Sequence, residues 1–402
     1  MPTQTDVVIV GAGLAGLRAA QLLTQRGFTV RLVDSSDHVG GRVHSSTTDG
    51  FILDQGFQLI NPSYPELVAS GVLEELDLRS FAPALRFSDG ETSFEVADPR
   101  YALMPNLRAL GGQLAPSDAF SLSRLLLAAR FTSTTRLTRG ADRTTLEGLL
   151  EVGLSPSVIN KVLQPFLRGT MLDETLETSW HYAQLLFKSF ASGRPGTPAT
   201  GVSALPLALL NSSPALQLHL HEAVTALTAT SVSTNTASYS ARAVLVATDQ
   251  STAAALIGTP DTGWRTQTAY WFATPQLEKS QQFRIDTKRG VWNMLDVSSV
   301  APERAPSGRG LVVASGVGDR DDALVRSDLA RLYDLDEGDV VLIERQVVTR
   351  ALPKLTTPLN CTRPASRGDL FVAGDWMQTP SIQGALVSGR RAADAITEQL
   401  AA

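Results

Sequence analysis

The sequence predicts an α/β fold built on a parallel sheet, together with a second, discontinuous region of antiparallel sheet plus helices. Three patterns indicate this fold. A buried strand runs directly into a glycine-rich turn over residues 7–16, apolar residues recur at helical spacing within residues 116–192, and strand-like runs separated by proline and glycine fill residues 264–350. At 402 residues the chain exceeds a typical single domain, so we expect two domains.

The first element is a strand over residues 7–10, where the run Val-Val-Ile-Val favours a strand covered on both faces. Gly11 permits a tight turn, Gly13 lets the backbone approach a pyrophosphate, and Gly16 lets the next helix pack close to the strand. That helix, expected over residues 17–25, directs its free N–H groups and the positive end of its dipole toward the phosphate.

A second strand is expected over residues 28–33, and it ends at Asp34. An acidic residue roughly 20 positions beyond the glycines lies where it can hold the hydroxyl groups of a ribose. The strand, turn, helix, strand and acid fall in register within about 30 residues, as dinucleotide binding requires. This motif alone does not distinguish FAD from a nicotinamide cofactor.

Two further motifs narrow the choice of ligand. In Gly40-Gly41-Arg42, the adjacent glycines bring the backbone close to a ligand, and the arginine supplies a planar positive fork for a phosphate or a flavin edge. Later in the chain, an expected strand over residues 370–373 leads into Gly374-Asp375-Trp376, and residues 381–386 open a last helix.

These motifs together resemble those of the flavin-containing amine oxidase and phytoene desaturase-like superfamily of FAD-dependent oxidoreductases. The resemblance covers most of the chain, and it implies FAD as the cofactor and a Rossmann-like FAD-binding domain. It implies that Asp34 holds the adenosine ribose and that Gly40, Gly41 and Arg42 line the flavin and its phosphates. It also implies that Asp375 binds the ribityl or pyrophosphate portion.

Two other parts of the FAD site follow from the same resemblance. The backbone at Val224 should contact adenine, and the last helix, beginning near Gln383, should point its N-terminus at the pyrimidine edge of the flavin. A helix N-terminus there stabilises the negative charge of a reduced flavin. The full set of expected cofactor-binding residues is Gly11, Gly13, Ala15, Gly16, Asp34, Ser35, Gly40, Gly41, Arg42, Gln58, Val224, Gly374, Asp375, Ile382, Gln383 and Ala385.

The positions of the motifs predict a discontinuous organisation. We expect an FAD-binding domain at residues 1–64, 200–262 and 355–402, and a substrate-binding domain at residues 65–199 and 263–354. Aromatic residues in the second domain are candidates for the wall of a substrate cavity, with core packing as the alternative. These candidates are Trp180, His181, Tyr182, Phe187, Tyr270 and Trp292.

The substrate class rests on departures from the amine oxidases of this superfamily, in which a lysine on a strand of the substrate domain holds a water beside flavin N5. The matching strand here, over residues 268–272, has no lysine, and the nearest ones are Lys279 and Lys288. Residues 381–383 also lack the aromatic side chain that forms one wall of an amine cage. Ala351-Leu352-Pro353, by contrast, resembles a short motif of the desaturases.

We therefore expect an enzyme, an FAD-dependent oxidoreductase that transfers a hydride from an apolar small molecule to flavin N5, with isoprenoids among the candidates. The alternatives are a flavin amine oxidase that produces hydrogen peroxide, a protoporphyrinogen-oxidase-like enzyme, and an FAD-containing protein without catalysis. No catalytic side chain is assigned. Oxygen and a quinone both stay open as electron acceptors, as does the oligomeric state.

Composition excludes several other classes. The net charge of −5 argues against nucleic-acid binding, and the single cysteine, Cys361, precludes an internal disulfide. His219 and His221 are expected to alternate on one strand face without enough further ligands for a metal. No secretion signal is recognisable and no apolar run reaches the ~20 residues of a membrane span, so we expect a cytoplasmic protein.

One segment leaves peripheral membrane contact open. Residues 122–143 hold five arginines beside the apolar run Leu125-Leu126-Leu127. A basic amphipathic helix can lie on anionic lipid. The alternative is a core helix followed by a solvated arginine face.

Overall fold

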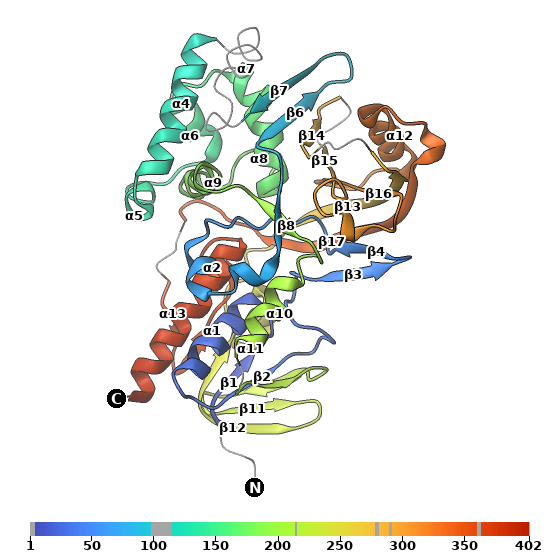
Figure 1. Ribbon diagram of the computed structural model, residues 1–402. Helices are drawn as coiled ribbons and strands as arrows, with labels where there is room; N and C mark the ends of the chain where they lie inside the picture. The colour runs from blue at the N-terminus through green and yellow to red at the C-terminus, as the bar shows by residue number, and fades with distance from the viewer. Residues whose placement is uncertain are drawn as a thin grey trace.

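The computed structural model describes residues 5–97, 115–213, 215–277, 281–288, 292–359 and 363–401. Figure 1 shows three groups of elements: a sheet with helices in the lower half, a helical group at the upper left, and a second sheet at the upper right. The mixed α/β fold with one largely parallel sheet confirms the predicted fold class.

The first sheet is parallel around the glycine-rich turn. Its strand order is β9-β2-β1-β12-β19, and each neighbouring pair in that series is parallel. The central strand β1 buries Val7, Val8 and Ile9 completely, as expected for a strand covered on both faces. The strands are β1 (Thr5–Val10), β2 (Val30–Val33), β9 (Gln217–His219), β10 (Val224–Leu227), β11 (Ser231–Thr234), β12 (Ser238–Val246), β18 (Ser366–Arg367) and β19 (Leu370–Val372).

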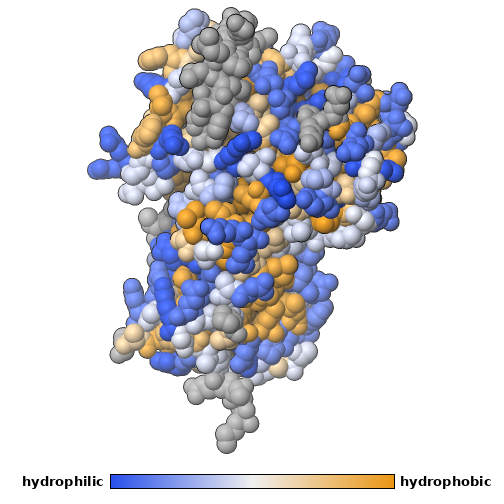
Figure 2. Space-filling view, in the orientation of Figure 1, coloured by the Kyte–Doolittle hydropathy of each residue, from blue (hydrophilic) through white to orange (hydrophobic). Residues whose placement is uncertain are grey.

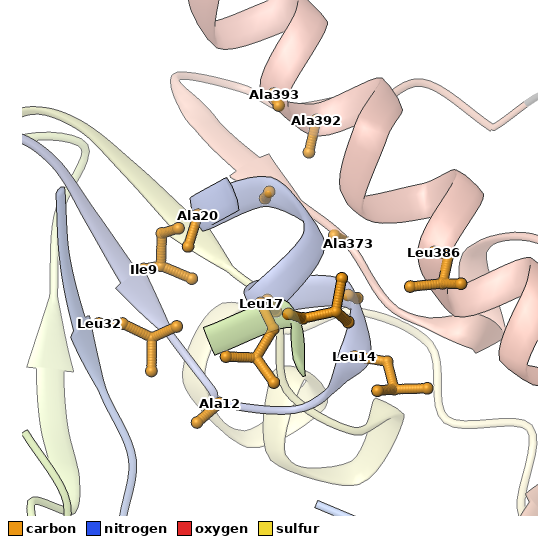
Figure 3. Packing of buried hydrophobic residues seen from close by; sticks show 14 of the residues in the cluster. Ile9, Ala12, Leu14, Leu17, Ala20, Leu32, Ala373, Leu386, Ala392 and Ala393 are labelled. Carbon is orange, nitrogen blue, oxygen red and sulfur yellow. The ribbon is translucent and has the colours of Figure 1, made fainter. Parts of the chain in front are cut away.

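Helices α1 (Leu14–Gln25) and α13 (Ile382–Ala401) cover this sheet together with α10 (Ala204–Asn211), and α11 (Gln250–Ile257) follows β12. Figure 3 shows Leu17 and Ala20 of α1 over Ile9 and Leu32 of the sheet, and Leu386, Ala392 and Ala393 of α13 on the far side of α1. Small residues at the α1–α13 contact allow close approach. A Cβ on Gly389 would overlap the carbonyl oxygen of Ala15.

The proposed division into two domains needs one adjustment. Helix α2 (Pro65–Ser70) and the 3-10 turn η1 (Leu73–Leu76) contribute Leu67, Val72 and Leu76 to the core of the first sheet. Glu66 also forms ion pairs with Arg18 and Arg390. We therefore propose that the first FAD-binding segment extends to about residue 76 rather than 64.

The second sheet has the order β17-β13-β16-β15-β14-β6-β7. All its pairs are antiparallel except β14 with β6, a parallel pair that corrects the expected wholly antiparallel sheet. Helix α12 (Asp322–Tyr333) covers one face of it, and the hairpin β3 (Ser45–Thr48) and β4 (Phe51–Asp54) packs on the other. The strands are β6 (Ala84–Ser88), β7 (Ser93–Ala97), β13 (Trp264–Pro275), β14 (Phe283–Asp286), β15 (Trp292–Asp296), β16 (Arg309–Gly316) and β17 (Val341–Pro353).

The helical group confirms the helices expected within residues 116–192. Its members are α4 (Pro116–Phe131), α5 (Thr134–Leu137), α6 (Thr145–Glu151), α7 (Pro156–Val158), α8 (Gln164–Met171) and α9 (Trp180–Ser192). All of them except α5 share one apolar core. The short pair β5 (Leu78–Ser80) and β8 (Gly196–Pro198) links this group to the first sheet. Among the described helices, none has both the length and the apolarity to cross a bilayer.

Candidate cofactor and substrate site

One large cavity, of about 1240 Å³, joins the glycine-rich turn to the helical group. We call its two parts the nucleotide groove and the apolar chamber. The nucleotide groove is lined by Gly11, Gly13, Ala15, Asp34, Ser35, Gly40, Gly41, Arg42, Glu222, Val224, Asp249, Gly374, Asp375, Ile382 and Ala385. The apolar chamber is lined chiefly by Phe81, Leu85, Phe87, Val96, Leu122, Leu126, Leu127, Val162, Leu163, Phe166, Leu186, Phe187, Phe190, Phe283 and Ile285.

The three glycines of the turn differ in what requires them. Gly11 has a φ of +109°, and a Cβ there would lie 2.8 Å from the carbonyl oxygen of Ala247. A Cβ on Gly16 would overlap the carbonyl oxygen of Gly11, so this residue serves the packing of α1 and does not line the cavity. Gly13 has an ordinary φ of −71°, and a Cβ there would meet no described atom within 4 Å. Neither backbone strain nor packing requires a glycine at position 13, which leaves room for a ligand.

The start of helix α1 is open toward the groove. Its N-cap residue is Gly13, and no side chain caps it. The first N–H groups of a helix lack partners within the helix, and together with the helix dipole they favour an anion. This geometry suits a pyrophosphate.

Asp34 holds the turn together at the end of β2. Its Oδ2 accepts a hydrogen bond from the backbone N–H of Ala12 at 2.6 Å, and its Oδ1 accepts one from Ser36 at 2.8 Å. An ionised carboxylate has about four acceptor positions, so two remain for ribose hydroxyls. Asp34 and Ser35 both line the groove.

Arg42 and Asp375, 333 positions apart, meet in the groove. The Nη2 of Arg42 lies 2.7 Å from Oδ1 of the buried Asp375, and its Nη1 donates to the carbonyl oxygen of Ala351. Gln58 fixes the same segment, because its Nε2 donates to the carbonyl oxygen of Arg42 at 2.6 Å. The two charged residues expected to contact the cofactor separately therefore line the cavity as an ion pair.

The end of the last strand and the start of α13 complete the groove. Gly374 has a φ of +151°, and its N–H donates to Ser388 Oγ. Ser381 Oγ accepts a hydrogen bond from the N–H of Gly384, while Ile382 and Ala385 line the cavity. Gln383 does not line it. Its Oε1 accepts a hydrogen bond from the N–H of Glu66, which fastens α13 to α2.

Sequence reasoning missed Glu222 in the groove. Strand β9 ends at His219, and His221 takes a φ of +59°, so the expected alternation of the two histidines on one strand face is wrong. The turn brings Glu222 to the cavity, where it accepts a hydrogen bond from the hydroxyl of Tyr239 at 2.8 Å. No local pattern in the sequence marks this turn. The described residues contain no cluster of three or more metal-ligating side chains, and Cys361 lies outside them.

Two of the six aromatic candidates, Tyr182 and Phe187, line the apolar chamber. The other four do not line it: Trp180, Tyr270 and Trp292 lie in apolar cores, and His181 is buried beside Asp142. The hydroxyl of Tyr182 donates to the carbonyl oxygen of Pro380 at 3.2 Å, beside the start of α13. Burial raises the pKa of Tyr182 and of the neighbouring Tyr64, so both phenols stay neutral at physiological pH.

No lysine and no carboxylate lines the apolar chamber within the described part of the chain. Lys188, on helix α9, donates instead to the carbonyl oxygens of Arg130 and Thr132 at 2.9 Å. Lys288 lies beside the turn at Gly90, and Lys279 is outside the described residues. The carboxylates of the cavity belong to Asp34, Glu222, Asp249 and Asp375, all in the groove.

The sequence model of the family "Flavin containing amine oxidoreductase" matches residues 14–397. The chain belongs to this family. It is an FAD-dependent oxidoreductase, and the open glycine turn, the spare acceptor positions of Asp34 and the N-terminus of α13 fit FAD.

Similar proteins of known name differ in substrate. Putrescine oxidase of Kocuria rosea is 42% identical over 95 residues, which cover 24% of this chain and 19% of that protein. The 4,4'-diapophytoene desaturase (4,4'-diapolycopene-forming) of a Methylomonas species is 36% identical over 104 residues, covering 26% of this chain and 18% of that protein. The matches thus span less than a fifth of the length of either relative.

The fold is similar over nearly the whole chain to solved structures. An oxidoreductase from Methanosarcina mazei superposes with a TM-score of 0.72 at 16% identity, covering 98% of this chain and 100% of the other. At this identity the similarity shows the fold alone.

Proposed function

We propose that this protein oxidises an apolar small molecule by dehydrogenation, with FAD as the hydride acceptor. The main support is one continuous cavity, in which a groove suited to FAD opens into a chamber walled chiefly by phenylalanine and leucine. FAD, when bound, supplies the hydride-accepting N5 atom. Isoprenoids belong to the substrate class that such a chamber fits.

The apolar wall of the chamber favours apolar substrates because their binding removes apolar surface from water. Transfer of apolar surface from water contributes about 25 cal/mol per Å², or roughly 0.8 kcal/mol per buried methylene. A long hydrocarbon would therefore bind without any charged partner. The same walls exclude water from the reacting carbon.

The chain's own polar groups act at the cofactor end of the cavity. The Arg42–Asp375 pair fixes the segment at residues 40–42 against residues 374–375, and the N-terminus of α13 faces the same end. We propose that these groups orient the flavin and stabilise the negative charge that hydride transfer places on it. Dehydrogenation of a C–H bond then depends mainly on position, with reacting atoms about 3–3.5 Å apart.

Amine oxidation is the first alternative, and similarity to putrescine oxidase favours it. An ammonium ion in the chamber would find no carboxylate among the described lining residues. Burial of an unpaired charge is costly, so the substrate amine would have to enter neutral. Amine oxidation is therefore less favoured than oxidation of an apolar molecule.

Protoporphyrinogen-oxidase-like chemistry is the other alternative. Arg130 and Arg194 line the cavity near the chamber and are suited to substrate carboxylates. Each already donates to a backbone carbonyl, of Ala191 and of Phe81 respectively.

A turnover experiment distinguishes the three reactions. The purified holoenzyme is incubated with a lipid extract of its host, with putrescine and cyclohexylamine, and with protoporphyrinogen, under oxygen or with a soluble quinone. We expect a desaturated product from the extract, with oxygen or the quinone consumed in proportion. Peroxide formed only from the amines, together with an aldehyde from putrescine and cyclohexanone from cyclohexylamine, would replace the proposal with amine oxidation.

We also propose that helix α4 rests on a lipid surface. Phe120, Leu127 and Phe131 repeat at seven- and four-residue spacing on one side of α4 and are 69%, 58% and 77% exposed. Figure 2 shows apolar side chains along the upper left edge, over α4, next to hydrophilic ones.

The charges near α4 suit anionic lipid. Arg124, Arg136 and Arg139 are exposed, whereas Asp118 and Asp142 accept hydrogen bonds inside the protein. Because Leu127 is exposed and also lines the apolar chamber, an apolar substrate would enter the chamber at this helix.

A further inference from the structure

Asn293 is a polar residue in the wall of the apolar chamber. It lies in β15, with Ile285 of β14 as its cross-strand partner. Phe87, Val162 and Ile285 form a buried apolar cluster at this part of the wall. In Figure 1, β15 and α8 lie in the upper half of the molecule, away from β1 and the start of α1.

Helix α8 lies in close contact with the Asn293 amide at Gly169. A Cβ on Gly169, in the last turn of α8, would overlap Nδ2 of Asn293. The φ of Gly169 is not in the left-handed region, so the backbone does not require a glycine there. A glycine inside a helix costs about 1 kcal/mol relative to alanine. This loss of helix stability is explained if position 169 must be glycine to leave room for the Asn293 amide at the chamber wall.

The Asn293 amide has no hydrogen-bond partner among the described residues, although other polar side chains of the cavity have one. The hydroxyl of Thr170 donates to the carbonyl oxygen of Phe166, and Asn61 donates to Ser189. Gln267 accepts a hydrogen bond from the N–H of Phe57. Asn293 is half-buried, so an apolar ligand that covers its amide without pairing with it removes the amide's hydrogen bonds to water, whereas a ligand atom that pairs with the amide replaces them.

We infer that Asn293 is a specificity-determining residue that binds an oxygen function on an otherwise apolar substrate. The inference rests on the proposed function, because it requires the substrate to occupy the chamber. A primary amide donates to a carbonyl oxygen and also accepts from a hydroxyl, so both groups fit. The substrate class becomes an apolar molecule with one carbonyl or hydroxyl group, in contact with β15 and α8.

The chemistry of the wall selects this class over its neighbours. A pure hydrocarbon would leave the amide desolvated and unpaired, which binding disfavours. A cationic group would meet a neutral amide and no carboxylate in the described chamber wall, and an anionic group would pair with Arg130 or Arg194 rather than with the amide. A neutral oxygen satisfies the amide at the lowest cost.

Binding of two matched probes to the holoenzyme tests the inference without turnover. The probes are 4-phenylbutan-2-one and n-butylbenzene, which differ by one carbonyl group, and each is measured by displacement of Nile red from the protein. Asn293→Leu should lower the ketone-to-hydrocarbon affinity ratio by about 3- to 10-fold, the worth of one neutral hydrogen bond. Thr170→Val, on the same chamber wall but already hydrogen-bonded within α8, should leave that ratio unchanged.

A second variant covers the outcome in which Asn293→Leu does not fold. Gly169→Ala keeps the amide but fills its space, so it should lower the same ratio, and the double variant Gly169→Ala/Asn293→Ala should equal Asn293→Ala alone. A ratio that is unchanged in both Asn293→Leu and Gly169→Ala, with butylbenzene still bound, overturns the inference and leaves the proposed function standing. Failure of both probes to displace Nile red overturns both.

Discussion

At the scale of single residues, Gly13 differs from Gly11 and Gly16 because the fold does not require a glycine at position 13. Backbone conformation requires Gly11 and packing requires Gly16, whereas a Cβ at position 13 would meet no described protein atom. The glycine at position 13 is explained if a ligand comes close to it. The sequence motif predicts all three residues but cannot rank them, because the atoms that surround them come from distant segments such as Ala247.

We predict that Gly13→Val folds but loses FAD. The φ of −71° and the open space allow a side chain, which then occupies the pyrophosphate position. Far-UV circular dichroism should be unchanged, and the flavin-to-protein ratio after purification should fall to about one tenth or less. Gly338→Val is the matched control, since Gly338 also has open space but lies outside the cavity. Full flavin content in Gly13→Val would refute the assigned role.

Asp173 gives a pH-dependent prediction. Burial disfavours its charge, but hydrogen bonds from Thr178 and Thr175, together with Arg265, outweigh burial and lower its pKa. A lowered pKa contributes stability above the unfolded value of about 3.9, and that contribution is lost as the pH falls through the folded value.

Asp173→Asn should therefore cost about 1–3 kcal/mol of unfolding free energy at pH 7. The gap to the wild type should narrow as the pH falls from about 5 to 3, because protonation of Asp173 removes the same interactions. Urea unfolding at several pH values measures both effects, with the exposed Asp336→Asn as control. A gap that stays constant with pH would show that the charge of Asp173 does not contribute.

At the scale of elements, the sequence predicts those helices and strands that interactions between residues near in sequence determine. The first β-α-β unit is specified by a β-branched run, glycines and an acid within about 30 residues, and α1 begins three residues earlier than expected. Helix α12 departs from the prediction that residues 264–350 are largely strands. Asp321 caps it by accepting hydrogen bonds from the N–H groups of Ala323 and Leu324, and an aspartate before a helical segment is a local signal for a helix start.

The parallel pairing of β14 with β6 joins segments nearly 200 residues apart. The periodicity of residues within one segment cannot predict such a pairing.

Helix α4 gives the prediction that belongs to this scale. The holoenzyme should sediment with vesicles that contain anionic lipid, and the double variant Phe120→Ser/Phe131→Ser should weaken this binding about tenfold or more, since two large apolar side chains leave the lipid. Leu207→Ser is the control, because Leu207 is an exposed apolar residue on α10. Equal binding of wild type and double variant, or no binding by either, would contradict the proposed lipid contact.

At the scale of the whole molecule, the cavity is the feature that no single segment specifies. One part of its nucleotide groove was predictable, because Gly11, Gly13 and Asp34 are close in sequence and all line the cavity. Glu222 was missed because a left-handed turn at His221 places it there. The apolar chamber draws on α4, α8 and α9 and on strands β6, β14 and β15, so only its aromatic character was foreseen, through Tyr182 and Phe187.

If the groove holds FAD and the chamber holds an apolar substrate, that substrate should reduce the flavin, and the anaerobic visible spectrum of the purified holoenzyme measures this reduction. The spectrum is recorded before and after addition of a lipid extract from the host, and then after addition of putrescine to a fresh sample. We predict flavin bands that bleach with the extract and persist with putrescine, because the described chamber wall is largely apolar and holds no carboxylate that could pair with an ammonium ion. Flavin bands that persist with the extract and bleach with putrescine would show that the chamber accepts an amine and not an apolar donor.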